Sequence, residues 1–406
     1  MKGFFSSSTI RLELFEKNSA IFNMSKGKIS LIGIGRLGIC TAMVFEKAGY
    51  EVLGVDINED YVNKINNKSL ISYEPHVCEM LAQSKNFRAT TNQVEAINFS
   101  DMIFICVDTP STGDDRYYDT FKLTNVLTSI NAEKPSNKHI MIMCTVLPGY
   151  IRNEGRQLIK DCTNCTLNYN PEFIAQGAII HGFLNPDVVL IGAENETAAS
   201  RIKEIYVNSV ANQPHYAIMA PESAEVMKIS LNCFVTTKIA YANMIADIAD
   251  KTPGANKFDI LKAVGMDSRV GMKCLMPGWS YGGPCFPRDN RALAGYADKI
   301  GIDAKISKAT NEINLQHVDF MAQNYLEKNK DTYVFEHIAY KQPCDVPITE
   351  ESAKCFVAVK LAKAGKTVIL RDQPHILEDA KRLFGKEADF VYEDIATPRD
   401  PATIDG

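Results

Sequence analysis

The sequence predicts an α/β protein in which two Rossmann-like α/β domains are joined by a long central helix and a small helical domain. A strand, a glycine-rich turn and a helix follow one another from Lys28 to Lys47. A single helical pattern extends from Pro221 to about Asp250, and a second strand–helix–strand pattern follows Gly301. Because strands that alternate with helices form parallel sheets, each of the two strand–helix patterns predicts an α/β domain.

Length and composition exclude several classes of protein. The chain has 406 residues, of which 46% are apolar and 23% are charged, a balance typical of soluble globular proteins with two or three domains. The net charge of −5 gives no general attraction to nucleic acid or to anionic membranes, so we expect neither as a partner. No run of about 18 apolar residues occurs, so no membrane span is expected.

The cysteines favour a reducing compartment. There are 11, an odd number without regular spacing, and no secretory signal is evident, so we expect free thiols in a cytoplasmic protein. Cys162 and Cys165 form one Cys-x-x-Cys pair, but no second pair or histidine cluster completes a zinc site, so no metal is expected. Residues 1–27 are interpreted as an N-terminal extension outside the fold.

A dinucleotide-binding motif follows the first predicted strand. Its first glycine makes a tight turn, its second lets a pyrophosphate approach, and its third lets the following helix pack closely. Asp56 ends the next strand about 20 residues on, where a carboxylate binds the ribose 2′-hydroxyl and repels a 2′-phosphate. An NAD-binding domain is therefore predicted over residues 28–210. The residues assigned to the cofactor here are Gly33, Ile34, Gly35, Arg36, Leu37, Gly38 and Asp56.

Polar residues follow later strands of the same domain. Thr109 follows one buried strand and Thr145 follows the next. Ligands of doubly wound sheets bind beyond the carboxyl ends of the strands, so both threonines are candidates to face the cofactor; the alternative is that they are ordinary turn hydroxyls. Glu172 is either a solvated loop acid or, within a cleft, an acid/base or water-positioning group.

The central domain, predicted over residues 211–306, begins with the long helix. Apolar residues cover more than one face of this helix, as is typical of a helix buried between domains or subunits. Lys228, Asn232 and Thr236 recur at every fourth position and form a polar stripe. A lysine by itself is usually solvated, but a lysine and an asparagine one turn apart suit the binding of an oxyanion and a hydroxyl.

A glycine-rich loop that ends in Cys285 is the most distinctive stretch. Pro287 predicts a helix start just after this cysteine, and the positive end of a helix favours the thiolate. Gly282 and Gly283 let the backbone approach a ligand closely. Asp289 lies one helical turn after the thiol, where it can handle protons. The alternative is a buried structural cysteine.

The last domain is predicted over residues 307–406. Its first strand is predicted from Thr332 to Tyr340, with Lys341 at its end, and the tail from Thr397 is predicted to be unstructured. No second Gly-x-Gly-x-x-Gly occurs there, so this domain is expected to bind something other than NAD. Arg269, before the cysteine loop, is a candidate to pair with phosphate or carboxylate through its planar fork.

These motifs, in this order, resemble those of the UDP-glucose/GDP-mannose dehydrogenase family over about residues 28–375. The resemblance implies NAD as the cofactor, a nucleotide sugar, most simply UDP-glucose, as the substrate, and a homodimer formed through the central helix. The most specific motifs are Gly33 to Gly38, Thr145 to Gly149, Asn170 to Phe173, Ser223-Ala224-Glu225 with Lys228 and Asn232, and Tyr281 to Asp289.

The resemblance also implies roles for individual residues. Cys285 is implied as the nucleophile, and Arg288 is implied near the cofactor. The residues implied to assist catalysis are Lys228, Asn232, Asp289, Glu172 and Thr145. Those implied to bind the substrate are Glu172, Phe173, Lys228, Asn232, Arg269, Tyr281, Gly282, Gly283 and Lys341.

The sequence departs from the family pattern before the last long helix. Glu350-Glu351-Ser352 stands where the family has Arg-Glu-Ser, so the usual cofactor-contacting arginine lacks a clear counterpart. Arg371 is only a weak substitute candidate. Three alternatives stay open: GDP-mannose or a UDP-N-acetylhexosamine as the substrate, a two-electron hydroxyacid dehydrogenase, and an NAD-binding protein without turnover.

Chemistry explains why these groups occur together. Oxidation of an alcohol to a carboxylate removes two hydrides, and the intermediate aldehyde gives up the second only after a nucleophile has added to it. Cys285 would add to the aldehyde, and Lys228 and Asn232 would stabilise the resulting oxyanion. Water activated by Asp289 or Glu172 would then hydrolyse the thioester.

Overall fold

The computed structural model describes residues 25–114 and 117–406 and divides into two compact units. The first unit comprises the described residues up to Pro110 together with Tyr118–Lys228, and the second comprises Ser111–Tyr117 and Ile229–Gly406. Most of the predicted N-terminal extension lies outside the described residues. Lys26, near its end, already donates its backbone N–H to the Gly49 carbonyl (3.0 Å).

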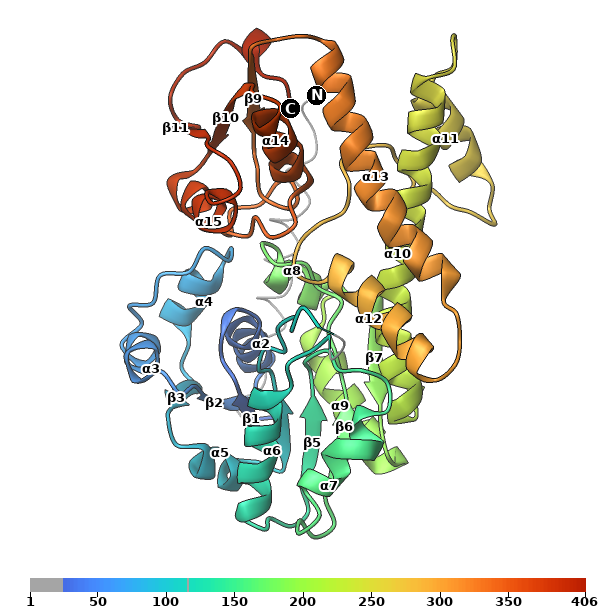
Figure 1. The fold of residues 1–406 in the computed structure, drawn as a ribbon. Helices are drawn as coiled ribbons and strands as arrows, with labels where there is room; N and C mark the ends of the chain where they lie inside the picture. Colours follow the sequence, from blue (N-terminus) through green and yellow to red (C-terminus); the bar gives the residue numbers. More distant parts are fainter. Residues whose placement is uncertain (1–24, 115–116) are drawn as a thin grey trace. The chain divides into compact units, whose positions relative to one another are not determined.

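An eight-stranded sheet forms the centre of the first unit (Figure 1). Its order is β3-β2-β1-β4-β5-β6-β7-β8, and neighbouring strands are parallel except for β6 and β7. The order reverses between β1 and β4, which is where doubly wound sheets open a crevice for a ligand. The strands are β1 Lys28–Ile32, β2 Glu51–Val55, β3 Phe87–Thr90, β4 Met102–Ile105, β5 His139–Ile142, β6 Thr166–Tyr169, β7 Val188–Gly192 and β8 His215–Met219.

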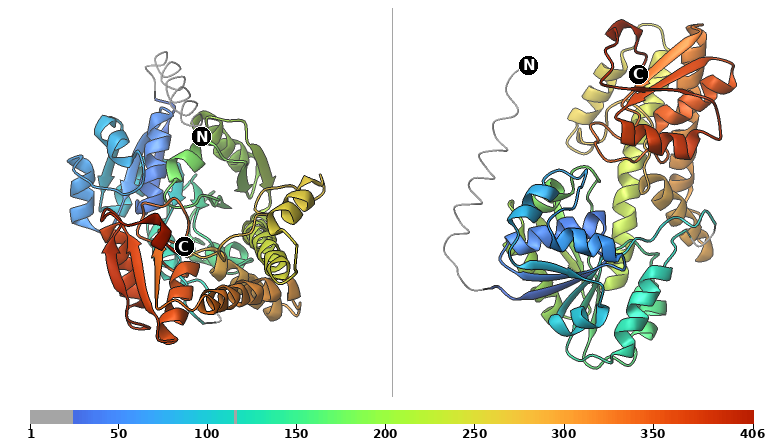
Figure 2. Two further views of the ribbon diagram at one scale, coloured as in Figure 1. Left: turned by 90° about the horizontal axis from the view of Figure 1, so that it is seen from above. Right: turned by 90° about the vertical axis from the view of Figure 1, so that its left-hand side faces the viewer.

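Helices cover both faces of this sheet, as Figures 1 and 2 show. Alternate side chains of a strand point to opposite faces, so Phe104 packs in one core and Ile103 and Ile105 pack in the other. The first core is closed by α2 Arg36–Lys47, α3 Glu59–Asn66, α4 Val77–Gln83, α8 Ile179–Leu184 and α9 Glu196–Ser209. The second is closed by α5 Gln93–Phe99, α6 Phe121–Ala132, the π-helix Ile151–Gly155 and α7 Arg156–Leu158.

The predicted long helix is confirmed as α10, Pro221–Asp250, which has 30 residues. Its first two turns belong to the first unit and the remainder to the second. Glu225 on the first part is fully buried. Its carboxylate accepts the backbone N–H of Gly149 (2.6 Å) and of Ile151 (2.8 Å), so α10 is bonded directly to the segment that follows β5.

The second unit combines helices with a small parallel sheet of order β11-β10-β9. The helix α13 packs against both α12 and α14. Among the helices of the described chain, none has both the length and the apolar character that crossing a bilayer requires. The elements are α11 Lys257–Met266, α12 Phe286–Lys299, α13 Lys305–Glu327, β9 Thr332–Glu336, α14 Ala353–Lys363, β10 Thr367–Asp372, α15 Pro374–Phe384, β11 Val391–Asp394 and a 3₁₀ turn Pro401–Thr403.

Two predictions for this unit are wrong. The strand predicted to reach Tyr340 ends at Glu336, because His337 has a φ of 54°, which is left-handed and incompatible with a strand. The tail predicted to be unstructured pairs with the edge of β9. Asp405 donates its N–H to the Val334 carbonyl (2.8 Å), and Glu336 donates its N–H to the Gly406 carbonyl (2.7 Å), so the tail occupies backbone groups that an edge strand leaves unpaired.

Burial of Glu225 makes the stability of the protein depend on pH. Desolvation raises the pKa of this carboxyl from 4.5 to about 7, although its two backbone N–H partners lower it. A raised folded-state pKa contributes stability that is fully present below the unfolded-state pKa and is lost as the pH rises through about 7. Between about pH 5 and about pH 8, the unfolding free energy of the wild type should fall by roughly 2–3 kcal/mol relative to that of Glu225→Gln.

Urea denaturation at a series of pH values measures this difference. Glu196, an exposed residue on α9 of the same unit, supplies the control Glu196→Gln. A difference between the wild type and Glu225→Gln that stays constant across the pH range would contradict the raised pKa.

Candidate functional site

The glycine-rich motif lies between β1 and α2, and two of its glycines are required by close packing. A Cβ at Gly33, whose φ is 91°, would lie 2.7 Å from the Cys106 carbonyl oxygen, and one at Gly38 would lie 2.0 Å from the Gly33 carbonyl oxygen. A Cβ at Gly35 would meet nothing within 4 Å, so this glycine faces open space. Because α2 begins at Arg36, its N-terminus faces the same opening, which fits a pyrophosphate.

Other predicted cofactor residues are held by hydrogen bonds to the rest of the first unit. Asp56 follows β2 and accepts the backbone N–H of Asn58 on Oδ1 (3.0 Å). The Ile34 carbonyl accepts a hydrogen bond from the Tyr61 hydroxyl (2.9 Å), and Arg36 Nη1 donates to Gln176 Oε1 (3.1 Å). The open space at Gly35, the helix N-terminus and the carboxylate after β2 together fit NAD.

The two predicted threonines lie together beyond the carboxyl ends of β4 and β5. Thr109 Oγ1 donates to the Thr145 carbonyl (2.8 Å), so each helps to place the other. The segment of Thr145 continues to Gly149 and Ile151, whose backbone N–H groups Glu225 accepts. Glu225 therefore supports the loop that carries Thr145.

Glu172 lies in a polar network within the first unit. Its Oε1 accepts a hydrogen bond from the Tyr206 hydroxyl on α9 (2.5 Å), and its backbone carbonyl accepts one from Lys228 Nζ (2.7 Å). Lys228 also lies 4.5 Å from the centroid of the Phe173 ring. Burial raises the pKa of Glu172 to about 7, while the Tyr206 hydrogen bond and the Lys228 charge lower it. A carboxyl with this pKa can exchange a proton near neutral pH.

The cysteine loop lies in the second unit, directly before α12. Cys285 occupies the N-cap of α12, and Pro287 lies in its first turn, which confirms the predicted helix start. The cysteine is exposed, which argues against a buried structural role. Asp289 is fully buried, and its carboxylate accepts hydrogen bonds from Asn232 Nδ2 (2.7 Å) and Arg288 Nε (3.1 Å). The structure thus joins Asn232 of the polar stripe to the acid beyond the thiol.

The glycine pair of the loop is required by contacts with the protein itself. A Cβ at Gly282 would lie 2.2 Å from the Glu351 carbonyl oxygen, and one at Gly283 would lie 2.4 Å from the Tyr340 ring. Gly283 also has a φ of 82°, which favours glycine. The approach of a ligand was the predicted reason for these glycines. In the structure Gly282 lets the loop pack on the turn before α14, and Gly283 lets it pack on Tyr340.

The remaining predicted substrate residues of this unit differ in their surroundings. Tyr281 is buried, and it exchanges two hydrogen bonds with the Asn314 side chain (3.0 and 2.9 Å). Lys341 Nζ lies 5.9 Å from the centroid of the Tyr340 ring. Arg269 is 86% exposed and pairs with its near neighbour Asp267 (2.7 Å), so its contacts in this structure are local.

Arg371 does not fill the place of the family arginine. Its side chain is 2% exposed and forms ion pairs with Glu336 (3.1 Å) and Glu393 (2.5 Å) across the small sheet. A buried arginine paired with two half-buried carboxylates stabilises the sheet and is not available to a ligand.

Sequence reasoning missed several polar partners of the candidate residues. Tyr206 contacts Glu172 from a helix 34 residues further along the chain, and Arg291 on α12 pairs with Glu351 across 60 residues. No local spacing connects such residues, because only the packing of distant elements brings them together. Glu225 belonged to a recognised motif, but its buried bonds to a backbone loop had no sequence signal.

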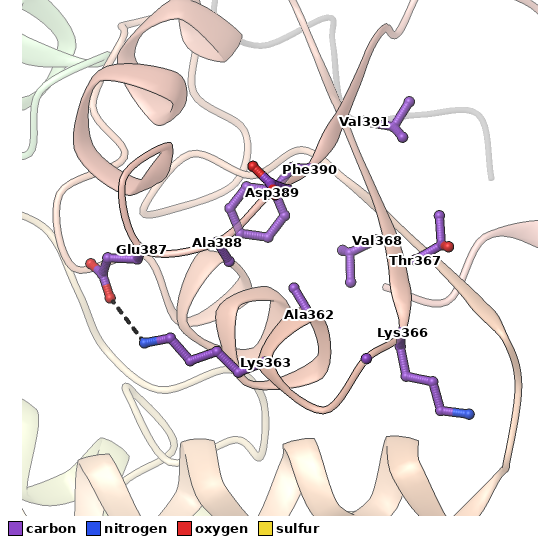
Figure 3. Close-up of a pocket in the computed structure, with 11 residues that line it drawn as sticks. Ala362, Lys363, Lys366, Thr367, Val368, Glu387, Ala388, Asp389, Phe390 and Val391 are labelled. Carbon is purple, nitrogen blue, oxygen red and sulfur yellow. Dashed lines mark ion pairs between the residues drawn. The ribbon is translucent and has the colours of Figure 1, made fainter.

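Two hollows lie in the second unit. One, of about 480 Å³, is lined in part by Trp279, His317 and Tyr325. The other, of about 570 Å³, lies at the amino-terminal ends of β10 and β11, where Lys363 pairs with Glu387 (Figure 3). Ligands of open α/β sheets bind at the carboxyl ends of the strands, so the second hollow lies at the opposite edge of its sheet.

Cys162 and Cys165 remain a pair of thiols in this structure. Burial and the neighbouring Cys165 raise the pKa of the Cys162 thiol to about 11. Within residues 25–114 and 117–406, no group of three or more histidine, cysteine, aspartate or glutamate side chains is arranged to hold a metal ion.

A doubly wound sheet with a glycine-rich turn after β1 and a carboxylate after β2 is typical of NAD-dependent oxidoreductases. The chain belongs to the UDP-glucose/GDP-mannose dehydrogenase family: residues 27–210 match its NAD-binding domain and residues 222–316 match its central domain. These findings confirm the predicted family, the predicted fold class, NAD as the cofactor and a nucleotide-sugar dehydrogenase as the activity.

Known proteins support the same assignment. The chain is 30% identical over 300 residues to a UDP-glucose 6-dehydrogenase of Haloferax volcanii, which covers 71% of this chain and 69% of that one. It is 26% identical to the UDP-glucose dehydrogenase of Pyrobaculum islandicum, whose structure superposes with a TM-score of 0.81 over 90% of this chain and 86% of that one. The UDP-D-ManNAc dehydrogenase of Pyrococcus horikoshii shares the fold (23% identity, TM-score 0.73, 91% and 90% covered).

Substitutions of two motif glycines should separate folding from cofactor binding. Gly38→Ala places a Cβ 2.0 Å from a backbone oxygen, which cannot rotate away, so the variant should lose about 1–3 kcal/mol or more of stability. Gly35→Ala meets no protein atom and should keep its stability but bind NAD about ten-fold more weakly, because the methyl group occupies the pyrophosphate approach.

Urea denaturation and calorimetric NAD titration measure the two effects, and each variant serves as the control for the other. Unchanged NAD affinity in a folded Gly35→Ala protein would place the pyrophosphate elsewhere.

Proposed function

We propose that this protein oxidises the C6 hydroxyl of UDP-glucose to the carboxylate of UDP-glucuronate in two successive NAD-dependent steps. The observation that carries the proposal is the exposed Cys285 thiol at the N-terminus of α12, one turn before the buried Asp289 that Asn232 binds. The similarity to UDP-glucose 6-dehydrogenases supports this choice of sugar. GDP-mannose and UDP-N-acetylhexosamines are the alternative substrates.

The residues of the first unit are proposed to hold the cofactor and to manage protons. Bound NAD supplies an acceptor for hydride. The proposal assigns its pyrophosphate to residues Gly33 to Gly38 and its ribose to Asp56. It places Thr109 and Thr145 beside the cofactor and adds Arg288 from the second unit. Glu172, with a pKa raised to about 7 by burial, is proposed to position or activate water.

The cysteine is proposed to capture the half-oxidised sugar. The Cys285 sulfur adds to the aldehyde carbon, the carbonyl oxygen becomes an oxyanion, and Lys228 and Asn232 stabilise it. Loss of the second hydride leaves a thioester. Water activated by Asp289 or Glu172 then attacks, which releases the carboxylate and restores the thiol.

Further residues are proposed to bind the substrate, and the protein is proposed to be cytoplasmic. Lys341, Tyr281, Gly282 and Gly283 are assigned to the sugar nucleotide in the second unit, and Arg269 is assigned to a substrate bound by a neighbouring subunit. Phe173, whose ring lies near the Lys228 ammonium, is proposed to contact the substrate. The cytoplasmic location rests on the thiol-rich composition of the chain.

An NADH assay tests the proposed reaction directly. With UDP-glucose the wild type should form two NADH for each sugar consumed, because two hydrides leave the same carbon. Cys285→Ala should form the acid roughly a thousand-fold more slowly or less, since a nucleophile is removed. Absorbance of NADH and chromatography of the sugar acid measure both quantities, and Cys274→Ala, which removes another exposed thiol of the same unit, is the control.

Other outcomes would change the assignment. One NADH per sugar, or full activity of Cys285→Ala, would favour a two-electron dehydrogenase. A higher kcat/KM with GDP-mannose or a UDP-N-acetylhexosamine than with UDP-glucose would change the substrate but not the reaction. NAD binding without turnover of any of these sugars would favour the non-catalytic alternative.

A homodimer through α10 is part of the proposal. Phe234, Tyr241 and Ile248 recur at seven-residue intervals on this helix and are 65%, 44% and 57% exposed. Seven residues are close to two helical turns, so these three side chains form one apolar stripe, and such a stripe is typical of a protein–protein contact.

Phe234→Lys should weaken self-association at least about ten-fold, since a charge replaces an aromatic side chain in the proposed contact. Sedimentation equilibrium measures the change. Phe121, which is 67% exposed on α6 of the first unit, provides the control Phe121→Lys. A monomeric wild type, or a Phe234→Lys protein that associates as strongly as the control, would contradict the dimer through α10.

A further inference from the structure

Arg291 and Glu351 form an ion pair between two segments of the second unit that are far apart in the sequence. Nη2 of the arginine lies 2.7 Å from one carboxylate oxygen of Glu351, and Nη1 lies 3.5 Å from the other, so the two planar groups meet fork to fork. Arg291 lies on α12, beyond Cys285 at its N-cap. Glu351 lies in the turn before α14 and directly precedes its N-cap, Ser352.

The backbone of the same turn holds the other end of the cysteine loop. Gly283 donates its N–H to the Glu350 carbonyl (2.9 Å). Gly282 packs so closely on the Glu351 carbonyl that a Cβ would lie 2.2 Å from it. The segment from Gly282 to Arg291, which contains the thiol, is therefore fastened to one turn at both ends.

The turn itself is held firmly in place. Glu351 has a φ of 51°, a left-handed conformation that a non-glycine residue keeps only where its surroundings impose it. Ser352 imposes part of this geometry: its hydroxyl caps α14 at Cys355 N and donates to the Ile338 carbonyl (2.8 Å). A turn fixed in this way can hold the loop that carries a reactive side chain in one position.

We infer that the Arg291–Glu351 ion pair is a positioning device that sets the orientation of Cys285. Glu351 is a positioning residue, since it acts on the thiol through α12 and through the glycine pair. The reaction rate falls steeply when a nucleophile is displaced from its reacting geometry. The ion pair holds α12 beyond the thiol, so it should affect the rate at which Cys285 reacts. The inference rests on the proposed role of Cys285 as the nucleophile.

Other charged side chains interact electrostatically with this pair. Arg288 on α12 pairs with Asp289 (3.1 Å), and its charge and that of Arg291 lower the pKa of Glu350. Burial outweighs these two charges and, together with the Glu351 carboxylate and Asp379 on α15, raises the pKa of Glu350 above its usual value. Neutralising one member of the Arg291–Glu351 pair changes the local net charge, whereas exchanging the two members preserves it. Charge exchange is therefore the informative test.

The experiment compares the wild type, Glu351→Gln, Arg291→Gln and the exchanged double variant Arg291→Glu with Glu351→Arg. The first readout is the rate at which iodoacetamide alkylates Cys285, followed by peptide mass spectrometry, with the exposed Cys274 as the internal control. The second is kcat and the KM for NAD with the sugar substrate. Each single variant should lower the Cys285 alkylation rate and kcat by about three- to ten-fold, and the exchanged variant should recover to within about two-fold of the wild type.

Unchanged alkylation and kcat in both single variants would overturn the inference, and so would an exchanged variant that folds like the wild type but recovers neither rate. If the exchanged variant does not fold, Arg291→Lys decides: retention of more than about half of the wild-type alkylation rate supports the ion pair, and a loss as large as that of Arg291→Gln contradicts it. Alkylation does not depend on dehydrogenase activity, so a failure of the proposed function would appear as absent turnover in the wild type while the alkylation result stands.

Discussion

Three nearby turns of one helix carry the polar contacts on which the candidate residues depend. On α10, the Glu225 carboxylate accepts two backbone N–H groups, Lys228 donates to the Glu172 carbonyl, and Asn232 donates to Asp289. A helix rises 1.5 Å per residue, so the spacing of these side chains is set by their positions in the sequence. Each is buried or nearly so, and a buried polar group left without its partner costs about 1–3 kcal/mol. The placement of Glu172 in the first unit and of Asp289 in the second each depends on its own contact with α10.

Burial gives two carboxylates of the first unit a similar pKa and different uses. Desolvation raises the pKa of both Glu172 and Glu225 to about 7. Both oxygens of Glu225 accept backbone N–H groups and the side chain is fully enclosed, so it supports a loop. Glu172 bonds one oxygen to Tyr206 and keeps part of its surface open, so it can exchange a proton with a ligand or with water. Their hydrogen-bond partners therefore indicate a structural role for Glu225 and a candidate catalytic role for Glu172.

Local patterns predicted much of the fold, and long-range contacts were the part they missed. The strands β1 and β2, the helix α10 and the helix start at Cys285 were predicted from hydrophobic periodicity, glycine spacing and proline position. The prediction that the first strand of the last domain reaches Tyr340 is wrong because the backbone of His337 is left-handed. The residue type at this position does not indicate that conformation. The role of Glu351 was not foreseen, since its partner Arg291 lies 60 residues away. The glycine pair was recognised, but the neighbours that require it proved to be parts of the protein, the Glu351 carbonyl for Gly282 and the Tyr340 ring for Gly283.

The sequence by itself determined the dinucleotide motif, the long helix, the cysteine before a helix start and hence the family, because each of these is a local arrangement whose chemistry depends on residues close together in the chain. Only the tertiary structure decided that Asn232 binds Asp289, that Tyr206 and Lys228 hold Glu172, and that Arg371 belongs to the small sheet. These contacts depend on which distant elements pack together and on how far each group is removed from water. Burial determines which polar groups must have a partner, and it determines which carboxyl groups hold a proton near neutral pH.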